Sequence, residues 1–200
     1  IPWNLYEWYG DLAPLRDNYE RMKRYVDYLG SRADNHIVAY GLGDWYDIGP
    51  DRPGYAQLTS NGVTATAIYY QDVKILERVA RLLGKEADVR KYAALASDIK
   101  RAFNEKFFDK KTLKYDRDSQ TANSIALHMD LVEPQYKAVV RQNLIDDIRR
   151  RGNALTAGDV GYRYVLRALE ENDASEVIYD MNSRYDVPGY GYQLAHGATC

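Results

Sequence analysis

The chain has 200 residues, with 27 Lys and Arg against 29 Asp and Glu and a formal net charge of −2. Its hydrophobic content of 46% and charged content of 28% are those of a globular domain and exclude a disordered tail. Because there is no basic excess and no apolar run near the ~18 residues that cross a bilayer, we expect neither a nucleic-acid nor a membrane partner.

Helical periodicity dominates the first half of the chain. A first helix is predicted from about Leu15 to Leu29, where Gly30 can end it in the left-handed conformation. A second helix is predicted from Asn61, as its N-cap, to Gly84, and a third over Tyr92–Phe103.

The second half continues the pattern after one strand signal. Phe107–Tyr115 is predicted to be a small β-hairpin. Helices are then predicted over Ala122–Met129, Pro134–Gly152, Asp159–Leu169 and Ala174–Met181, with Thr156 or Asp159 as the N-cap of the third of these. We therefore expect an all-α protein of antiparallel helix pairs with one β-hairpin.

Short and long connections alternate along this series. The turns around Gly84, Pro134 and Asn172 are tight, which is typical of helical hairpins. Because alternate connections of an up-down array lie at opposite ends, the long connections are expected to share one end and form a site. These long connections are Gly30–Ser60, Phe107–Ser119, Gly152–Gly158 and Arg184–Cys200.

No regular helical repeat is present, which favours a closed (α/α)6 barrel of helical hairpins over a solenoid. A closed barrel needs roughly 350 residues at the ~40 to 60 residues of each helix pair here. We therefore expect an incomplete barrel, with residues 1–200 as part of a single barrel domain.

The aromatic content and one loop point to a sugar site. There are 19 Tyr and 3 Trp but only 3 Phe, a balance that suits a wet concave surface. In the Gly41–Pro50 loop, three glycines and a proline present Asp44, Trp45 and Asp47 together. A pyranose can stack on the indole while carboxylates accept its hydroxyls. The alternative is that the aspartate caps the loop and the tryptophan fills the core.

The last segment, Pro188–Cys200, offers Tyr192 and His196 as further sugar-binding candidates. Its alternating glycines and tyrosines predict a non-helical loop, and a lone histidine in a loop is more often structural than functional. Cys200, the single cysteine, fits no disulfide or metal site, and the three histidines lack metal-ligand spacing. Nucleotide, zinc and serine-hydrolase motifs are absent, so we expect no metal and no cofactor.

At these residues the chain resembles the bacterial α-L-rhamnosidases, glycoside hydrolase family 78, which are (α/α)6-barrel enzymes. The resemblance runs through the whole chain and implies a hydrolase that removes terminal α-L-rhamnose from glycans or glycosides with inversion. The motifs that carry it are Pro2-Trp3, Tyr9-Gly10-Asp11, Gly43-Asp44-Trp45, Asn61-Gly62-Val63, Leu83-Gly84, Phe103-Asn104, Thr121-Ala122-Asn123, Leu155–Gly161, Gly189-Tyr190-Gly191-Tyr192 and Gly197-Ala198-Thr199.

The resemblance also assigns roles. It implies that Trp45 contacts the rhamnose, and that the catalytic acid lies before residue 1 and the base after residue 200, so that residues 1–200 contain neither. It slightly favours a periplasmic or secreted protein. Two alternatives stay open, namely another helical-barrel glycosidase or lyase with a different sugar, and a non-catalytic helical binding scaffold.

Overall fold

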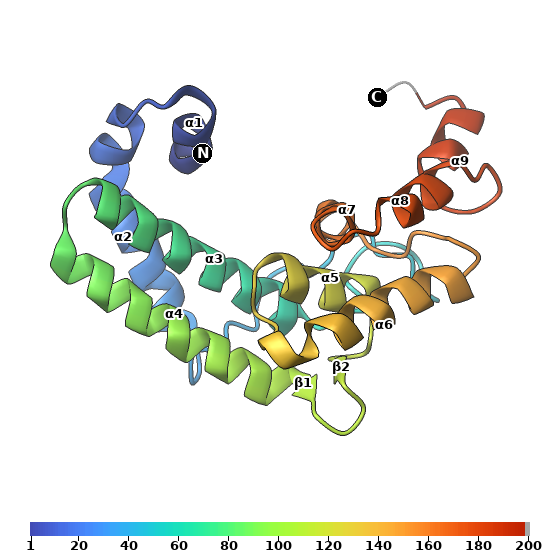
Figure 1. Cartoon of the computed structure of the whole chain (residues 1–200), viewed down its shortest axis with the longest axis horizontal. Helices are drawn as coiled ribbons and strands as arrows, with labels where there is room; N and C mark the ends of the chain where they lie inside the picture. Colours follow the sequence, from blue (N-terminus) through green and yellow to red (C-terminus); the bar gives the residue numbers. More distant parts are fainter. Residues whose placement is uncertain (199–200) are drawn as a thin grey trace.

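The computed structural model describes residues 1–198, which are mainly helical (Figure 1). The helices follow one another along an open crescent, with α1 at one tip and α9 at the other. Thr199 and Cys200 lie outside the described residues, within which no helix is long and apolar enough to cross a membrane. The elements are α1 (Pro2–Tyr9), α2 (Ala13–Arg32), α3 (Asn61–Leu82), α4 (Glu86–Phe107), β1 (Phe108–Asp109), β2 (Lys114–Tyr115), α5 (Gln120–His128), the 3-10 helix η1 (Pro134–Tyr136), α6 (Lys137–Arg150), α7 (Tyr162–Glu170), α8 (Ser175–Asn182) and α9 (Tyr190–Ala195).

The α3–α4 hairpin shows how the chain forms two layers. One stripe of α4 is buried, at Tyr92, Ala96, Ile99 and Phe103. This spacing of three to four positions is that of a helix with one face on the core. In contrast, α3 is buried around most of its circumference, because it packs against α2, α4 and α5. Helix α3 is therefore the inner helix of the pair and α4 the outer one.

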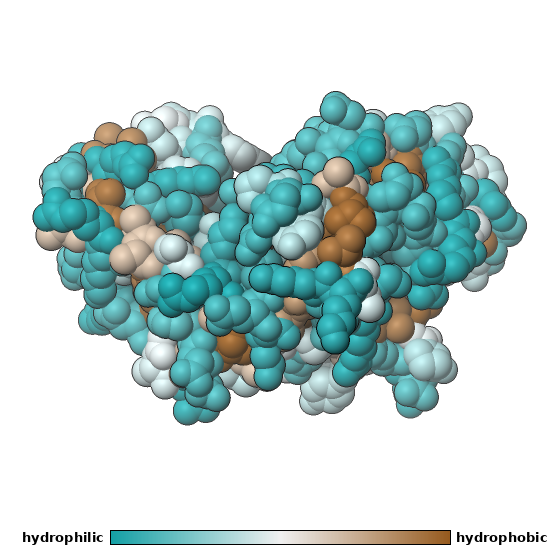
Figure 2. All heavy atoms as spheres, turned by 60° about the horizontal axis from the view of Figure 1, so that its bottom comes forward, coloured by the Kyte–Doolittle hydropathy of each residue, from teal (hydrophilic) through white to brown (hydrophobic). Residues whose placement is uncertain are grey.

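The α5–α6 pair repeats the arrangement. Every residue of α5 from Gln120 to Leu127 is buried, whereas α6 buries only Val140, Leu144, Asp147 and Ile148. Figure 2 turns α4, α6 and the β-hairpin toward the viewer, and this surface is mostly hydrophilic with separate apolar patches. Alternating inner and outer helices confirm the expected hairpin architecture.

The predicted β-hairpin is present between α4 and α5. Phe108 pairs with Tyr115 and Asp109 with Lys114 in antiparallel register. The rings of Phe108 and Tyr115 lie 4.8 Å apart, and the Tyr115 hydroxyl donates to Asn104 Oδ1 at 2.5 Å. These contacts attach the hairpin to the last turn of α4.

The predicted helices are all found, but Gly30 does not end the first of them. Helix α2 continues through Gly30 to Arg32. A Cβ at Gly30 would lie 3.1 Å from the Tyr69 hydroxyl of α3. The glycine therefore permits the close approach of two helices, which sequence alone does not distinguish from a helix end.

Two predicted N-caps are also wrong. Ser60 is the N-cap of α3, and the Asn61 side chain instead donates to the Gly41 carbonyl at 2.8 Å. Helix α7 begins later than expected, after Gly161, and neither Thr156 nor Asp159 caps it. In both places, tertiary contacts with the Gly41–Pro50 loop take the position of a local cap.

The long connections share one end of the array, as predicted. Hydrogen bonds join them directly, so the loops form one continuous surface rather than separate excursions. These bonds run from Ser60 N to Asp116 Oδ2 (2.8 Å), from Arg117 Nη1 to the Gln57 carbonyl (2.8 Å), from Gly158 N to Asp44 Oδ2 (2.9 Å) and from Leu155 N to the Pro188 carbonyl (2.9 Å).

The tight turns do not all lie far from the end that holds the long connections. The turn around Asn172 lies beside the start of α6, where Arg141 Nε donates to the Asn172 carbonyl at 2.6 Å. However, Tyr136 of η1 lies 4.8 Å from Phe108 at the foot of the β-hairpin. Helix α5 has only 9 residues, so its turn reaches only part of the way along the 22-residue α4.

Candidate functional site

The Gly41–Pro50 loop is anchored by the carboxylate of Asp44. This side chain is fully buried and accepts three hydrogen bonds, from the Thr121 hydroxyl (2.5 Å), Gly158 N (2.9 Å) and Gly161 N (2.7 Å). The partners lie on α5 and on the segment before α7, and they are 77, 114 and 117 residues away from Asp44 in the sequence. One carboxylate thus joins three parts of the fold.

Two of these partners have to be glycines. A Cβ at Gly158 would lie 2.2 Å from the carbonyl oxygen of Trp45, and one at Gly161 would lie 2.0 Å from Thr121 Oγ1. Neither distance is possible without moving the backbone of the loop or α5. The glycines are therefore required by close packing against the loop, since neither has a positive φ.

Electrostatics at Asp44 combine opposing effects. Burial has the largest effect and raises the pKa of its carboxyl group above the ordinary value, although the bonds from Thr121, Gly158 and Gly161 lower it in part. Gly161 is also the N-cap of α7, where the free amides of a helix start carry partial positive charge. The carboxyl group is thus held by donors aimed at it.

Asp47 anchors the other end of the loop. It is 1% exposed, and its oxygens accept from Gln57 N at 2.9 Å and Leu58 N at 2.7 Å. Asp44 and Asp47 are therefore closed to solvent and bonded to backbone amides. The expectation that they accept sugar hydroxyls directly is corrected, since this geometry makes them loop anchors.

Trp45 lies between the two anchors and is half-buried. Its carbonyl oxygen accepts from Asp159 N at 2.8 Å, which ties its backbone to the segment before α7. The rings of Tyr46 and Tyr55 meet the indole edge-on, at centroid distances of 5.4 and 5.0 Å. The structure therefore fixes the indole within a cluster of three aromatic rings.

Tyr192 and His196 come together on a helix that the sequence did not predict. Their rings stack at 4.0 Å and 26°, and His196 Nδ1 lies 2.8 Å from the Tyr192 carbonyl oxygen. Both side chains are exposed. This i, i+4 pair follows from helical spacing.

The prediction of a non-helical loop over this segment is wrong, because α9 spans Tyr190–Ala195. Gly191 is placed by packing, since a Cβ there would lie 2.2 Å from the Arg184 carbonyl oxygen. The Asn182 side chain accepts from Tyr190 N at 3.3 Å at the start of α9. Glycine alternation thus reflected close packing rather than an irregular backbone.

The segment before α7 lies between the two candidate loops. Ile48 N donates to the Thr156 carbonyl at 2.9 Å, and Leu155 N donates to the Pro188 carbonyl at the same distance. Within residues 1–198, no ring contact or hydrogen bond joins Trp45 directly to Tyr192 or His196. The structure brings Asp44, Trp45 and Asp47 together and places the α9 pair on the same loop surface.

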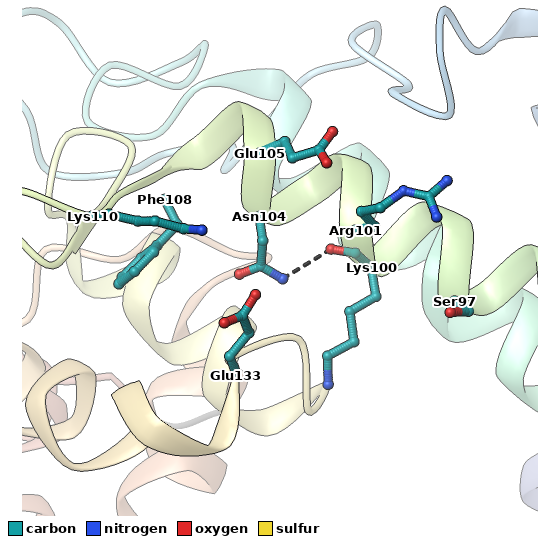
Figure 3. A pocket seen from close by; sticks show the side chains of 8 residues that line it. All are labelled: Ser97, Lys100, Arg101, Asn104, Glu105, Phe108, Lys110 and Glu133. Carbon is teal, nitrogen blue, oxygen red and sulfur yellow. Dashed lines mark hydrogen bonds between the residues drawn. The ribbon is translucent and has the colours of Figure 1, made fainter.

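A cavity of about 530 Å³ lies elsewhere, between α4, the β-hairpin and the α5–α6 connection (Figure 3). Its central Asn104 amide donates to the carbonyls of Lys100 at 2.9 Å and Leu131 at 2.8 Å, and accepts from Tyr115. The amide is therefore already bonded within the chain. This cavity contains none of the candidate sugar-binding residues.

Sequence reasoning missed the residues that hold and flank Trp45. Thr121, Gly158 and Gly161 stood in motifs of the resemblance, but nothing local linked them to Asp44. For Tyr55, no sequence signal marked the contact with the indole. In the part of the chain that the structure describes, no group of three or more His, Cys, Asp or Glu is placed to hold a metal ion.

Comparison with known proteins identifies this arrangement. Residues 1–200 match the bacterial alpha-L-rhamnosidase six-hairpin glycosidase domain. The chain belongs to this family. An α-L-rhamnosidase of Formosa agariphila is 28% identical over 200 residues, covering all of this chain and 22% of the relative.

Solved rhamnosidase structures share the fold. The α-L-rhamnosidase of Dictyoglumus thermophilum superposes on 99% of this chain with a TM-score of 0.92 and 36% identity, over 23% of its own length. The Streptomyces avermitilis enzyme, solved with L-rhamnose, covers 98% of this chain with a TM-score of 0.88 and 27% identity, over 18% of its length. The chain thus spans about a fifth of the relatives that it matches.

Proposed function

We propose that residues 1–200 form part of a single (α/α)6 barrel, and that the full-length protein hydrolyses terminal α-L-rhamnose from glycans or glycosides. The observation that carries this proposal is the family match over the whole chain, together with structural neighbours of the same activity. The anchored Gly41–Pro50 loop, which contains the Gly43-Asp44-Trp45 motif, also supports it, because a sugar ring can stack on the indole of Trp45.

In this proposal Trp45 supplies the apolar contact for the rhamnose ring. The indole is half-buried in a rigid loop, so little conformational entropy is lost when a sugar stacks on it. Asp44 and Asp47 position the loop through backbone amides. Tyr192 on α9 and His196 directly after it, both exposed, are the candidates for hydrogen bonds to sugar hydroxyls.

The reaction proposed is hydrolysis with inversion. One carboxylic acid protonates the leaving oxygen, and a carboxylate about 6.5–9.5 Å away activates water on the other face of the sugar. The family resemblance puts both groups outside residues 1–200. The role of this chain is then to bind and orient the glycone between them.

A panel of aryl glycosides tests the proposed activity in the full-length protein. We expect hydrolysis of the α-L-rhamnoside and little hydrolysis of other sugars. Preference for another sugar would assign the chain to a different helical-barrel glycosidase. Binding without hydrolysis of any member would favour a carbohydrate-binding scaffold.

The stereochemistry has a separate test. Proton NMR of the first sugar released, recorded before mutarotation, should show the β anomer of L-rhamnose. Release of the α anomer would indicate retention and overturn the inverting assignment.

A further inference from the structure

Two exposed tyrosines of the Gly30–Ser60 connection flank Trp45. Tyr46 is 53% exposed and Tyr55 is 68% exposed. Both rings nevertheless contact the indole, at 5.4 and 5.0 Å between centroids. Among the described residues neither phenol hydroxyl has a hydrogen-bond partner within the chain. The pair thus presents large apolar faces and free polar tips beside the proposed rhamnose contact.

The backbone holds these rings in place at an energetic cost. Tyr46 has a φ of 63°, in the left-handed region that bulky residues rarely adopt. Tyr46 N donates to the Gly54 carbonyl at 2.8 Å, which closes the loop and brings Tyr46 next to Tyr55. Asp47, the next residue, is fixed by its bonds to Gln57 and Leu58. Such backbone strain is common at binding sites.

The ring planes separate two stacking surfaces. Tyr46 is inclined by 84° and Tyr55 by 81° to the indole of Trp45. A sugar ring stacked flat on the indole cannot also lie flat on either tyrosine. Because Tyr46 and Tyr55 are 53% and 68% exposed, each ring keeps surface that can contact a second ring, adjacent to the first and turned relative to it.

We infer that Tyr46 and Tyr55 form a subsite for the leaving group, and that this subsite takes a ring with an apolar face, either an aromatic aglycone or a second pyranose. The inference rests on the proposed rhamnosidase function, in which Trp45 holds the glycone. The phenol hydroxyls can then form hydrogen bonds with polar groups at the edge of that ring. An alkyl leaving group offers no face for this contact.

The test compares variants of the full-length protein on three substrates with one glycone. These are methyl α-L-rhamnoside, an aryl α-L-rhamnoside and a disaccharide with terminal α-L-rhamnose. The variants are Tyr55→Ala and Tyr46→Gly, because glycine accepts the positive φ without new strain. Tyr28→Ala is the control, since this tyrosine is 52% exposed on α2 and makes no ring contact with Trp45.

We expect each variant to lower kcat/KM for the ring substrates by about three- to tenfold relative to methyl rhamnoside, mainly through KM. The control should leave these ratios unchanged. A loss confined to the aryl rhamnoside would identify an aromatic leaving group, and one confined to the disaccharide a saccharide. Equal losses on all three substrates, or no loss on any of them, would overturn the proposed subsite but not the proposed activity. An inactive wild-type protein would overturn the proposed function as well.

Discussion

At the scale of single residues, Asp44, Trp45 and Asp47 of the Gly41–Pro50 loop have two different roles, although the sequence suggests sugar binding for all three. The carboxylates of Asp44 and Asp47 point into the protein and bind amides. Trp45, between them, keeps part of its indole accessible. The anchors and the proposed ligand contact therefore predict different outcomes on mutation.

Trp45→Ala should reduce activity without unfolding the protein. Loss of an aromatic contact in the transition state should cost about 2–4 kcal/mol, or roughly 30- to 1000-fold in kcat/KM. Steady-state kinetics with an aryl rhamnoside and the melting temperature measure both effects. Tyr28→Ala, at a tyrosine 52% exposed on α2, is the control. Activity within about twofold of wild type would exclude the indole as the glycone contact.

Asp44→Asn should act on stability first. The amide nitrogen cannot accept a hydrogen bond, so one buried donor among Thr121, Gly158 and Gly161 loses its partner. The expected loss is about 1–3 kcal/mol in the free energy of unfolding, measured by urea denaturation. Asp51→Asn, directly after the loop and exposed, should change stability little. Equal effects of the two variants would contradict the anchoring role.

At the scale of elements, close packing of glycines connects the loop to α7. Gly161→Ala would place a Cβ 2.0 Å from Thr121 Oγ1 and 2.8 Å from Asp44 Oδ2. We expect a destabilisation of at least about 2 kcal/mol and a lower melting temperature. Gly54→Ala, where a Cβ meets nothing within 4 Å, should be close to neutral. A neutral Gly161→Ala would show that the loop and α5 can separate at low cost.

A second element-scale prediction concerns Asp72 on α3. It lines a cavity of about 380 Å³ with Trp3 and Tyr25, and burial raises its pKa to about 6. A raised pKa means that the folded state favours the protonated carboxyl, so stability is lost as pH rises from about 4 to above 6. Asp72→Asn should remove this loss and be about 1–2 kcal/mol more stable than wild type at pH 8, with no difference near pH 4.

Melting temperatures of both proteins across this pH range measure the effect. Asp17→Asn, at an exposed position of α2, is the matched control and should follow the wild-type curve. A constant offset between Asp72→Asn and wild type at every pH would show that the carboxyl does not titrate in this range.

Elements with strong periodicity were predictable, and those fixed by distant contacts were not. Helices α2 to α8 carry apolar stripes of their own that anticipate burial. Helix α1 buries no residue and α9 buries only Gly191, so neither carries such a stripe. Pro2 at the start of α1 and Gly10 after its end, with a φ of 70°, are local signals that could have located it.

The candidate site divides in the same way. Its glycine content and its pairing of carboxylate with indole pointed to Asp44 and Trp45. The direction in which Asp44 faces depends on Thr121, Gly158 and Gly161, which are 77 to 117 positions away. No local pattern contains that information. The sequence therefore left two interpretations equally open, namely a sugar site, or an aspartate that caps the loop beside a tryptophan that fills the core.

At the scale of the whole molecule, the crescent has α1 at one tip and α8 and α9 at the other (Figure 1). Trp8 and Tyr9 of α1 are 78% and 73% exposed, and Tyr179 of α8 and Leu194 of α9 are 74% and 69% exposed. In a closed ring of helical hairpins, such surfaces pack against neighbouring hairpins. Exposed apolar patches instead promote association.

A polypeptide of residues 1–200 alone should therefore self-associate and lack glycosidase activity. Size-exclusion chromatography should show an apparent mass that rises with concentration, because the uncovered tips of different molecules can bury one another. Inactivity is expected because the proposed acid and base lie outside these residues, so the sugar can be held but the leaving oxygen cannot be protonated. The full-length protein at the same molar concentration is the control. Turnover of an aryl rhamnoside by the short polypeptide at a comparable rate would place the catalytic pair within residues 1–200 and require a new assignment of the carboxylates on the loop surface.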